Sequence, residues 1–221
     1  MKLEQIYTGC LSHAAYYLES NGEAAVIDPL RDIDEYLQLA NERKTKIKYI
    51  FETHFHADFV SGHVDLAKAT GAKIIYGPET EASFDFYLAK DGETFSLGDI
   101  TLQVLHTPGH TLESTCYLLK DAAGKDFAVF TGDTLFVGDV GRPDLAQKGA
   151  NLTMEDLAAM LYRSLQNKIA PLADDVLIEL EEQHLIRTAL TIMEERCRTI
   201  LSMIYLRDPA ASYIEVAAAI G

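Results

Sequence analysis

Short apolar runs alternate with polar turns along most of this chain, and that alternation predicts many short β-strands. The runs at 14–19 and 23–28 flank Asn21-Gly22, a dipeptide typical of a two-residue hairpin turn. We therefore expect an antiparallel hairpin near the start of the chain. Further short strands are expected at 47–51, 73–76, 93–97, 100–105, 115–119, 127–130 and 175–179.

Helical spacing of apolar residues indicates two short helices between the early strands. Asp32 and Glu35 form a capping-box-like pair, which predicts a helix that runs to about Arg43. Residues 64–70 are typical of a second helix, which Gly71 ends.

A longer helix is expected late in the chain, after a loop over 138–153 that holds three glycines. Thr153 and Asp156 supply its N-terminal cap, and Pro171 ends it. Its apolar residues follow one face, as is typical of core packing: Met154, Leu157, Ala158, Leu161, Leu165 and Ile169.

The overall composition is that of an ordinary globular protein, with 221 residues, 48% hydrophobic and 24% charged. Its net charge of -15 argues against a nucleic-acid partner. The first residues lack a signal-peptide core, and no apolar run reaches membrane-spanning length. Three widely spaced cysteines, Cys10, Cys116 and Cys197, argue against a disulfide framework, so we expect a cytoplasmic protein without a membrane partner.

Ligand-type side chains follow three of the predicted strands. His54, His56 and Asp58 stand at i, i+2 and i+4 after the 47–51 run, a spacing that would place them on one side of an extended segment. His110 and Asp133 follow two later strands. Side chains of these types from three strand ends suit zinc or iron, although an aspartate in Thr-Gly-Asp-Thr is also common as a turn former.

The other histidines carry weaker signals. His63 and His106 stand close enough in sequence to the candidate site to orient a ligand through the second ring nitrogen. His13 and His184 have no partner motif, so we interpret them as surface or packing residues.

Three motifs carry a resemblance to a known family: His54-Phe-His56-Ala-Asp58, Thr-Pro-Gly-His110-Thr and Thr-Gly-Asp133-Thr-Leu-Phe. Together they resemble the metallo-β-lactamase superfamily. The segment from Phe136 to Leu145 is similar, more narrowly, to the persulfide dioxygenases. The likeness runs from about residue 3 to 178, which we take as a catalytic domain 1–178, and it implies an αββα sandwich with the metal at one edge of the paired sheets.

The resemblance also implies a reaction. One Fe(II) would be bound by His56, His110 and Asp133, which are at the family's ligand positions, and the two imidazoles and one carboxylate would leave sites for O2 and a persulfide, usually that of glutathione. The products would be sulfite and a thiol. His54 and Asp58 are then expected as catalytic, water-holding residues and as less certain metal ligands.

Two positions bear on the branch of the family. Phe59 stands where hydrolases of the superfamily, such as glyoxalase II, generally carry a histidine that binds a second metal, and phenylalanine cannot ligate. Arg142 matches a position that lies close to glutathione in the family, so we expect it to bind a substrate carboxylate. A surface salt bridge is the alternative for Arg142.

Residues 179–221 depart from the family pattern. They predict an appended helical tail, and 185–221 weakly resemble an incomplete helix-turn-helix of bacterial sigma factors. Four arginines against seven acidic residues give this segment the wrong sign for DNA.

Two alternatives to the dioxygenase stay open: a zinc-dependent thioester hydrolase of the glyoxalase II type, and an inactive metal-binding scaffold. The thiol carrier and the oligomeric state, including a homodimer, are also open.

Overall fold

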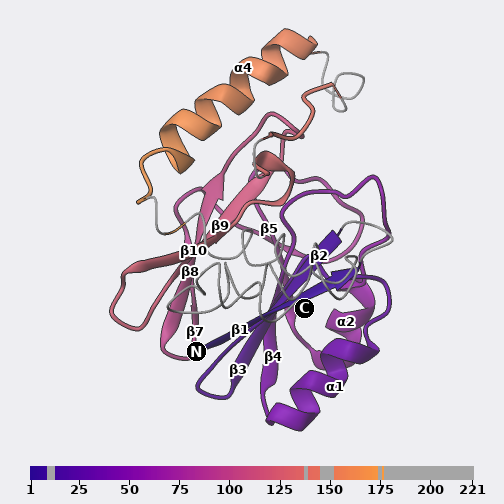
Figure 1. The fold of residues 1–221 in the computed structure, drawn as a ribbon. Coiled ribbons are helices and arrows are strands. Elements are labelled where there is room, and N and C mark those ends of the chain that lie inside the picture. The colour runs from indigo at the N-terminus through magenta and orange to yellow at the C-terminus, as the bar shows by residue number, and fades with distance from the viewer. Residues whose placement is uncertain (9–12, 137–138, 145–151, 174–175, 177–221) are drawn as a thin grey trace, which may run out of the picture. The chain divides into compact units, whose positions relative to one another are not determined.

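The computed structural model describes residues 1–8, 13–136, 139–144, 152–173 and 176. These fall in one compact unit that ends at Val176 (Figure 1). The predicted helical tail 179–221, its likeness to sigma factors, the domain boundary at 178, His184 and nearly all of the predicted strand 175–179 lie outside the described residues.

The first sheet has six strands in the order β1-β2-β3-β4-β5-β6. The predicted hairpin is confirmed, since β2 and β3 pair antiparallel around Asn21 and Gly22, which both have positive φ. Strand β1, which the sequence pattern did not predict, pairs antiparallel with β2 at the edge of the sheet. Strands β3 to β6 pair in parallel. The bounds are β1 Lys2–Thr8, β2 His13–Ser20, β3 Glu23–Ile27, β4 Lys46–Phe51, β5 Lys73–Tyr76 and β6 Tyr87–Leu88.

The second sheet has four antiparallel strands in the order β10-β9-β8-β7. Aromatic pairs join the two sheets across the core: Phe51 lies 4.8 Å from Tyr117 and 5.5 Å from Phe95 between ring centroids. The two sheets therefore face each other as the predicted sandwich. The bounds, close to those predicted, are β7 Thr94–Leu97, β8 Ile100–His106, β9 Thr115–Lys120 and β10 Asp126–Phe130.

Helices α1 (Asp34–Arg43) and α2 (His63–Thr70) cover the six-stranded sheet (Figure 1). Each buries a large side chain, Tyr36 and Leu66, in the cluster formed with that sheet. Asp32 accepts a hydrogen bond from the Asp34 amide but is not the N-cap itself. Among the described residues, no helix combines the length and apolar character needed to cross a membrane.

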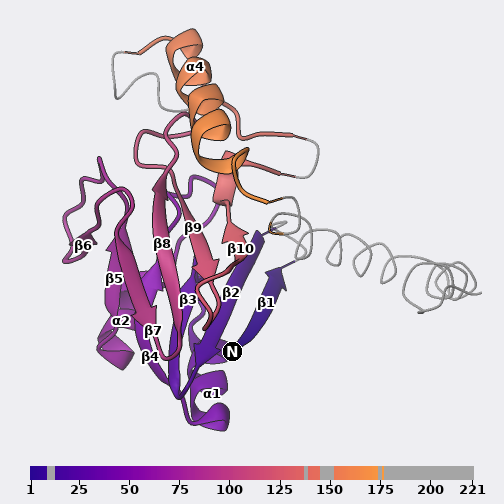
Figure 2. The same ribbon diagram turned by 90° about the vertical axis from the view of Figure 1, so that its left-hand side faces the viewer.

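Helix α4 (Met154–Ser164) continues into a π-helical turn, η2 (Leu165–Ile169), and lies beyond the upper ends of β8 and β9 (Figure 2). The predicted capping box is present, since Thr153 and Asp156 satisfy each other's backbone amides. Three residues of the predicted stripe are buried: Leu157, Leu161 and Ile169.

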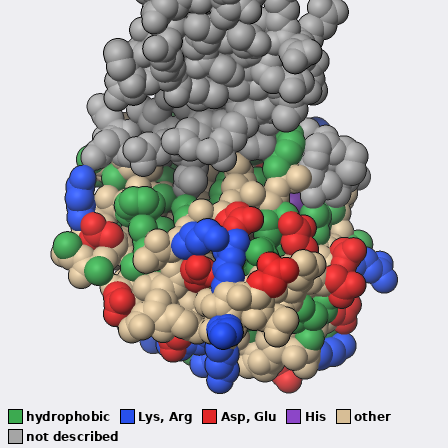
Figure 3. All heavy atoms as spheres, turned by 60° about the horizontal axis from the view of Figure 1, so that its bottom comes forward, with side chains coloured by type: hydrophobic (Ala, Val, Ile, Leu, Met, Phe, Trp, Pro, Cys, Tyr) green, Lys and Arg blue, Asp and Glu red, His purple; other side chains and the backbone are tan. Residues whose placement is uncertain are grey.

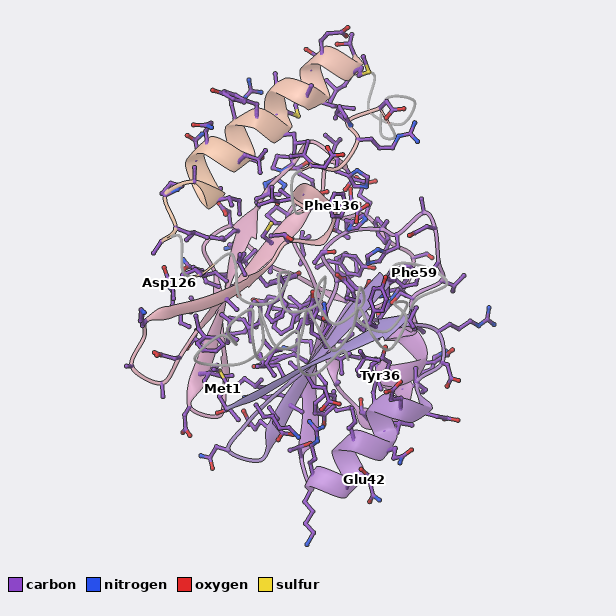
Figure 4. The ribbon with its side chains drawn as sticks, in the orientation of Figure 1. Met1, Tyr36, Glu42, Phe59, Asp126 and Phe136 are labelled. Carbon is purple, nitrogen blue, oxygen red and sulfur yellow. The ribbon has the colours of Figure 1, made fainter. Side chains whose placement is uncertain are left out.

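The strand ends that carry the candidate ligands meet at one end of the sandwich. The Thr115 amide donates to the Thr53 carbonyl across 2.8 Å, which joins the end of β4 to the start of β9. Phe59 and Phe136, which both follow strands, lie well above Glu42 of α1 in Figure 4. On the face that Figure 3 shows, acidic and basic side chains are mixed rather than segregated.

Candidate metal centre

His54, His110 and Asp133 converge at this end of the sandwich. Nε2 of His110 lies 3.4 Å and Nε2 of His54 3.9 Å from Oδ2 of Asp133, and the three ligand atoms all lie within 4.8 Å of one another. Bonds of about 2.1 Å to a tetrahedral zinc would separate its ligand atoms by roughly 3.4 Å. The triangle therefore has dimensions that fit one metal ion.

Hydrogen bonds set the imidazole of His54 for metal binding. The Thr53 hydroxyl donates its one proton to Oδ2 of Asp28 across 2.8 Å, so it must accept from Nδ1–H of His54 at 3.0 Å. The lone pair of Nε2 then points toward Asp133. Burial, with His56 close by, lowers the pKa of His54 to about 3, which keeps the ring neutral.

His110 is oriented in the same way. Its Nδ1–H donates to the backbone carbonyl of Arg142 across 3.0 Å, which leaves Nε2 with a lone pair. The loop that carries His110 packs on α4, because Ser164 donates to the Pro108 carbonyl and a β-carbon on Gly109 would fall 2.4 Å from Cβ of Leu161. Helix α4 thus supports this ligand.

Asp133 lies in η1 (Gly132–Thr134), directly after β10. Its side chain is 42% exposed, so it is the triangle's opening to solvent. Partial burial raises the pKa of the carboxyl, while His110 and His56 oppose that rise. Two imidazoles and this carboxylate make a donor set suited to zinc or to non-haem iron.

His56 faces a different group of side chains. Its Nε2 lies 3.1 Å from Oδ1 of Asp28 and 3.7 Å from Oε2 of Glu52. Strand β4 ends at Phe51, so the histidines lie beyond the strand and its alternation of side chains does not place them on one side. Nε2 of His54 faces Asp133, whereas Nε2 of His56 faces Asp28. The triangle contains His54 in place of His56, whose role as a ligand stays a prediction.

The charges around His56 are strongly coupled. Burial lowers its pKa, but the Asp28 carboxylate and its hydrogen bond outweigh burial and raise the pKa to about 9. Burial opposes the ionisation of Asp28, yet His56 and His54 hold the pKa of that carboxyl below its ordinary value. Burial and Asp28 raise the pKa of Glu52 well above its ordinary value.

The remaining predicted residues lie around these two groups. Asp58 is exposed and belongs to neither. The Phe59 ring packs 4.1 Å from the ring of His13 and 4.3 Å from that of His56, so it fills space beside the site. The Arg142 side chain is 67% exposed and forms a surface salt bridge with Asp144, the alternative to binding a substrate carboxylate.

Other histidines differ in their closeness to the site. Nδ1 of His63 lies 3.3 Å from Oε1 of Glu52, and His13 donates to the Asp28 carbonyl. His106 donates to the Leu112 carbonyl. Sequence reasoning missed Asp28, Glu52 and Thr53, although Asp28 follows an apolar strand and Glu52-Thr53 directly precede the histidine motif.

The model of the metallo-beta-lactamase superfamily matches residues 8–178. The chain belongs to this superfamily. The superfamily match confirms the predicted fold class, and the donor groups above make it a plausible metal-binding member.

Relatives among curated proteins correct the predicted reaction. The cytoplasmic hydroxyacylglutathione hydrolase of Arabidopsis thaliana is 34% identical over 74% of this chain and 61% of its own. A probable hydroxyacylglutathione hydrolase of Schizosaccharomyces pombe is 31% identical over 77% and 63%. The chain thus spans about three fifths of the length of these relatives. Because the relatives are named as hydrolases, the prediction of a persulfide dioxygenase, an oxidoreductase that uses O2, is wrong.

Solved structures give the same fold. A metallo-beta-lactamase from Staphylococcus aureus has a TM-score of 0.72 and 37% identity, and covers 80% of this chain and 54% of its own. ETHE1 from Myxococcus xanthus has a TM-score of 0.69 and 31% identity, over 80% and 74%.

Proposed function

We propose that this chain hydrolyses a thioester of glutathione with one zinc ion held by His54, His110 and Asp133. The observation that carries the proposal is the convergence of these three side chains, with Nδ1 of each histidine engaged in a hydrogen bond and Nε2 turned toward Asp133. The names of the curated relatives supply the substrate class. As part of the same proposal we place the chain in the cytoplasm.

The site favours one ion at this triangle over two. Phe59 occupies the place where a second-metal histidine would stand, and its ring packs between His13 and His56. Zinc bound by the triangle would act as a Lewis acid toward the thioester carbonyl and would lower the pKa of water.

The chain's own residues hold the ligands in place. Thr53 and the Arg142 carbonyl each keep a proton on Nδ1 of one histidine, so that Nε2 stays a ligand throughout turnover. Asp133, at the solvent-facing corner, is placed to accept a proton from attacking water. In this proposal the exposed guanidinium of Arg142 would release Asp144 and pair with a carboxylate of glutathione.

The test is zinc content together with thioester cleavage. The 221-residue chain is purified without added metal, and its zinc and iron are measured. An S-(2-hydroxyacyl)glutathione is then supplied, and the released thiol is followed. We expect zinc-dependent thiol release that is lost in Asp133→Asn. Stoichiometric zinc at the triangle without thiol release would overturn the proposal and favour the inactive scaffold.

A further inference from the structure

A pocket opens on the side of the six-stranded sheet that carries α2, next to β5 and β6 (Figure 2). Its lining comes from α2, from the start of β5 and from residues 84–87, which end in β6. The volume of about 520 Å3 falls within the roughly 300–1,000 Å3 that is typical of small-molecule sites. None of the proposed metal ligands lines this pocket, so it is a separate feature of the molecule.

The floor of the pocket is apolar and held in place by aromatic contacts. The rings of Phe84 and Phe86 lie 5.9 Å apart, and they pack on the buried ring of Tyr76 at 6.1 and 5.7 Å. A fourth ring, that of His63, lies 4.7 Å from Phe84. Both phenylalanines stay partly exposed. Contacts of this kind fix the two rings, so the pocket has ready apolar walls for a ligand.

Two lysines, Lys68 and Lys73, line the same pocket. Nζ of Lys73 lies 4.9 Å from the centre of the Tyr87 ring, and the Tyr87 hydroxyl donates to Glu93 across 2.7 Å, which holds that ring. Lys73 forms no ion pair within the described part of the chain, and Lys68 has only an exposed partner, Asp65, at 3.9 Å. An exposed pair of that length contributes little, so both ammonium groups can bind an incoming anion.

The charge of the lining differs in sign from that of the whole chain. Asp85 is the one acidic residue of the lining against the two lysines, whereas the chain has a net charge of -15. Positive charge beside an apolar floor complements a ligand that is both anionic and apolar. A cation or a strongly hydrated anion would match only one of these two features.

We infer that this pocket binds a small organic acid, with a carboxylate or sulfonate group on an aromatic body. The aromatic body packs against Phe84 and Phe86, and the acid group pairs with Lys68 and Lys73. The volume limits the ligand to the size of a small molecule. This binding does not depend on a metal or on the hydrolysis of a thioester.

The test compares two fluorescent probes that share one apolar body. The first, 8-anilinonaphthalene-1-sulfonate, carries an acid group, and N-phenyl-1-naphthylamine is the same molecule without that group. Fluorescence titration of the 221-residue chain measures the affinity for each probe. The double variant Lys68→Gln/Lys73→Gln should weaken binding of the sulfonate about tenfold, through the loss of two exposed charge pairs, and leave binding of the neutral probe unchanged.

Three further variants locate the probes. Ala67→Phe places a ring on the wall that α2 contributes and should weaken both probes. Lys46→Gln removes an exposed lysine outside the pocket and should weaken neither. Val60→Ser removes a 62% exposed apolar side chain that follows the histidine motif, and it should also leave both affinities unchanged.

Several outcomes would overturn the inference. They are an unchanged affinity for the sulfonate in the double lysine variant, an equal loss of both probes in it, or a loss of the sulfonate in Val60→Ser. Retention of both probes by a folded Ala67→Phe would overturn it as well. In case Ala67→Phe does not fold, a crystal structure of the unsubstituted chain with the sulfonate decides the matter. A probe between α2 and Phe84 supports the site, and a probe bound only elsewhere contradicts it.

Discussion

Oγ1 of Thr53 lies 3.0 Å from Nδ1 of His54, and this contact fixes which nitrogen of the histidine faces Asp133. The same hydroxyl donates to Asp28, so Thr53 can only accept from His54. Thr53 is not itself a proposed metal ligand, but it determines that Nδ1 of the proposed ligand His54 carries the proton.

Thr53→Val should weaken metal binding while keeping the shape of the side chain. Valine removes the acceptor for His54 and leaves Oδ2 of Asp28 without this donor, so we expect zinc affinity to fall about 10- to 100-fold. Competition with a chromogenic chelator measures the affinity. Thr53→Ser keeps the hydroxyl and should retain most of it; equal losses in the two variants would show that the hydroxyl is not responsible.

Gly109→Ala should displace His110. Gly109 has a φ of 147°, and a β-carbon there would meet Leu161 of α4 at 2.4 Å, so the loop and the helix must separate. Overpacking and backbone strain together should lower the free energy of unfolding by about 2–4 kcal/mol and reduce zinc affinity. Urea unfolding and chelator competition measure the two effects.

Gly124→Ala is the matched control for that substitution. Gly124 also has positive φ, 79°, but a β-carbon there would have nothing within 4 Å. It should lower stability by about 1 kcal/mol without changing zinc affinity. A comparable loss of affinity in both variants would mean that the contact with Leu161 does not position His110.

Much of the fold was predictable because its signals are local. Asn21-Gly22 specifies its hairpin, and Thr153 with Asp156 specifies the start of α4. Strand β1 was missed because it is an edge strand with polar residues on both faces, and its partner β2 provides the pairing that defines it.

The site was predictable in its motifs but not in its contacts. His110 and Asp133 were expected together, and they meet. Which of His54 and His56 joins the triangle depends on Asp28, which lies 25 positions before Thr53 in the chain. Asp28 orients His54 through Thr53 and contacts His56 directly. No local spacing contains that information.

Arg142→Ala should raise KM for a glutathione thioester and leave zinc content unchanged. The substitution removes the guanidinium and with it a charged pair with the substrate, which is worth roughly tenfold in KM. The backbone carbonyl that accepts from His110 remains, so zinc binding should not change. Asp144→Ala frees the same guanidinium and should lower KM. An unchanged KM in both variants would leave Arg142 as a surface salt bridge.

The stability of the metal-free chain should fall as pH rises from about 6.5 to 9. The folded-state pKa of His56 is raised to about 9 and that of Glu52 well above its ordinary value, so above pH 6.5 the folded chain holds protons that the unfolded chain has released. Each such proton lowers the free energy of unfolding by up to about 1.4 kcal/mol per pH unit. Below pH 6.5 the effects of His54 and Glu52 oppose each other, and the change should be smaller.

Urea unfolding in the presence of a chelator, at several pH values, measures this dependence. Glu52→Gln cannot titrate at that position and should have a shallower alkaline slope than the unsubstituted chain. Because metal ligands bind in their deprotonated forms, zinc in place of the chelator should flatten the slope. A slope that is the same in both chains would mean that the buried cluster does not retain its protons on folding, and the charges assigned to Glu52 and His56 would be wrong.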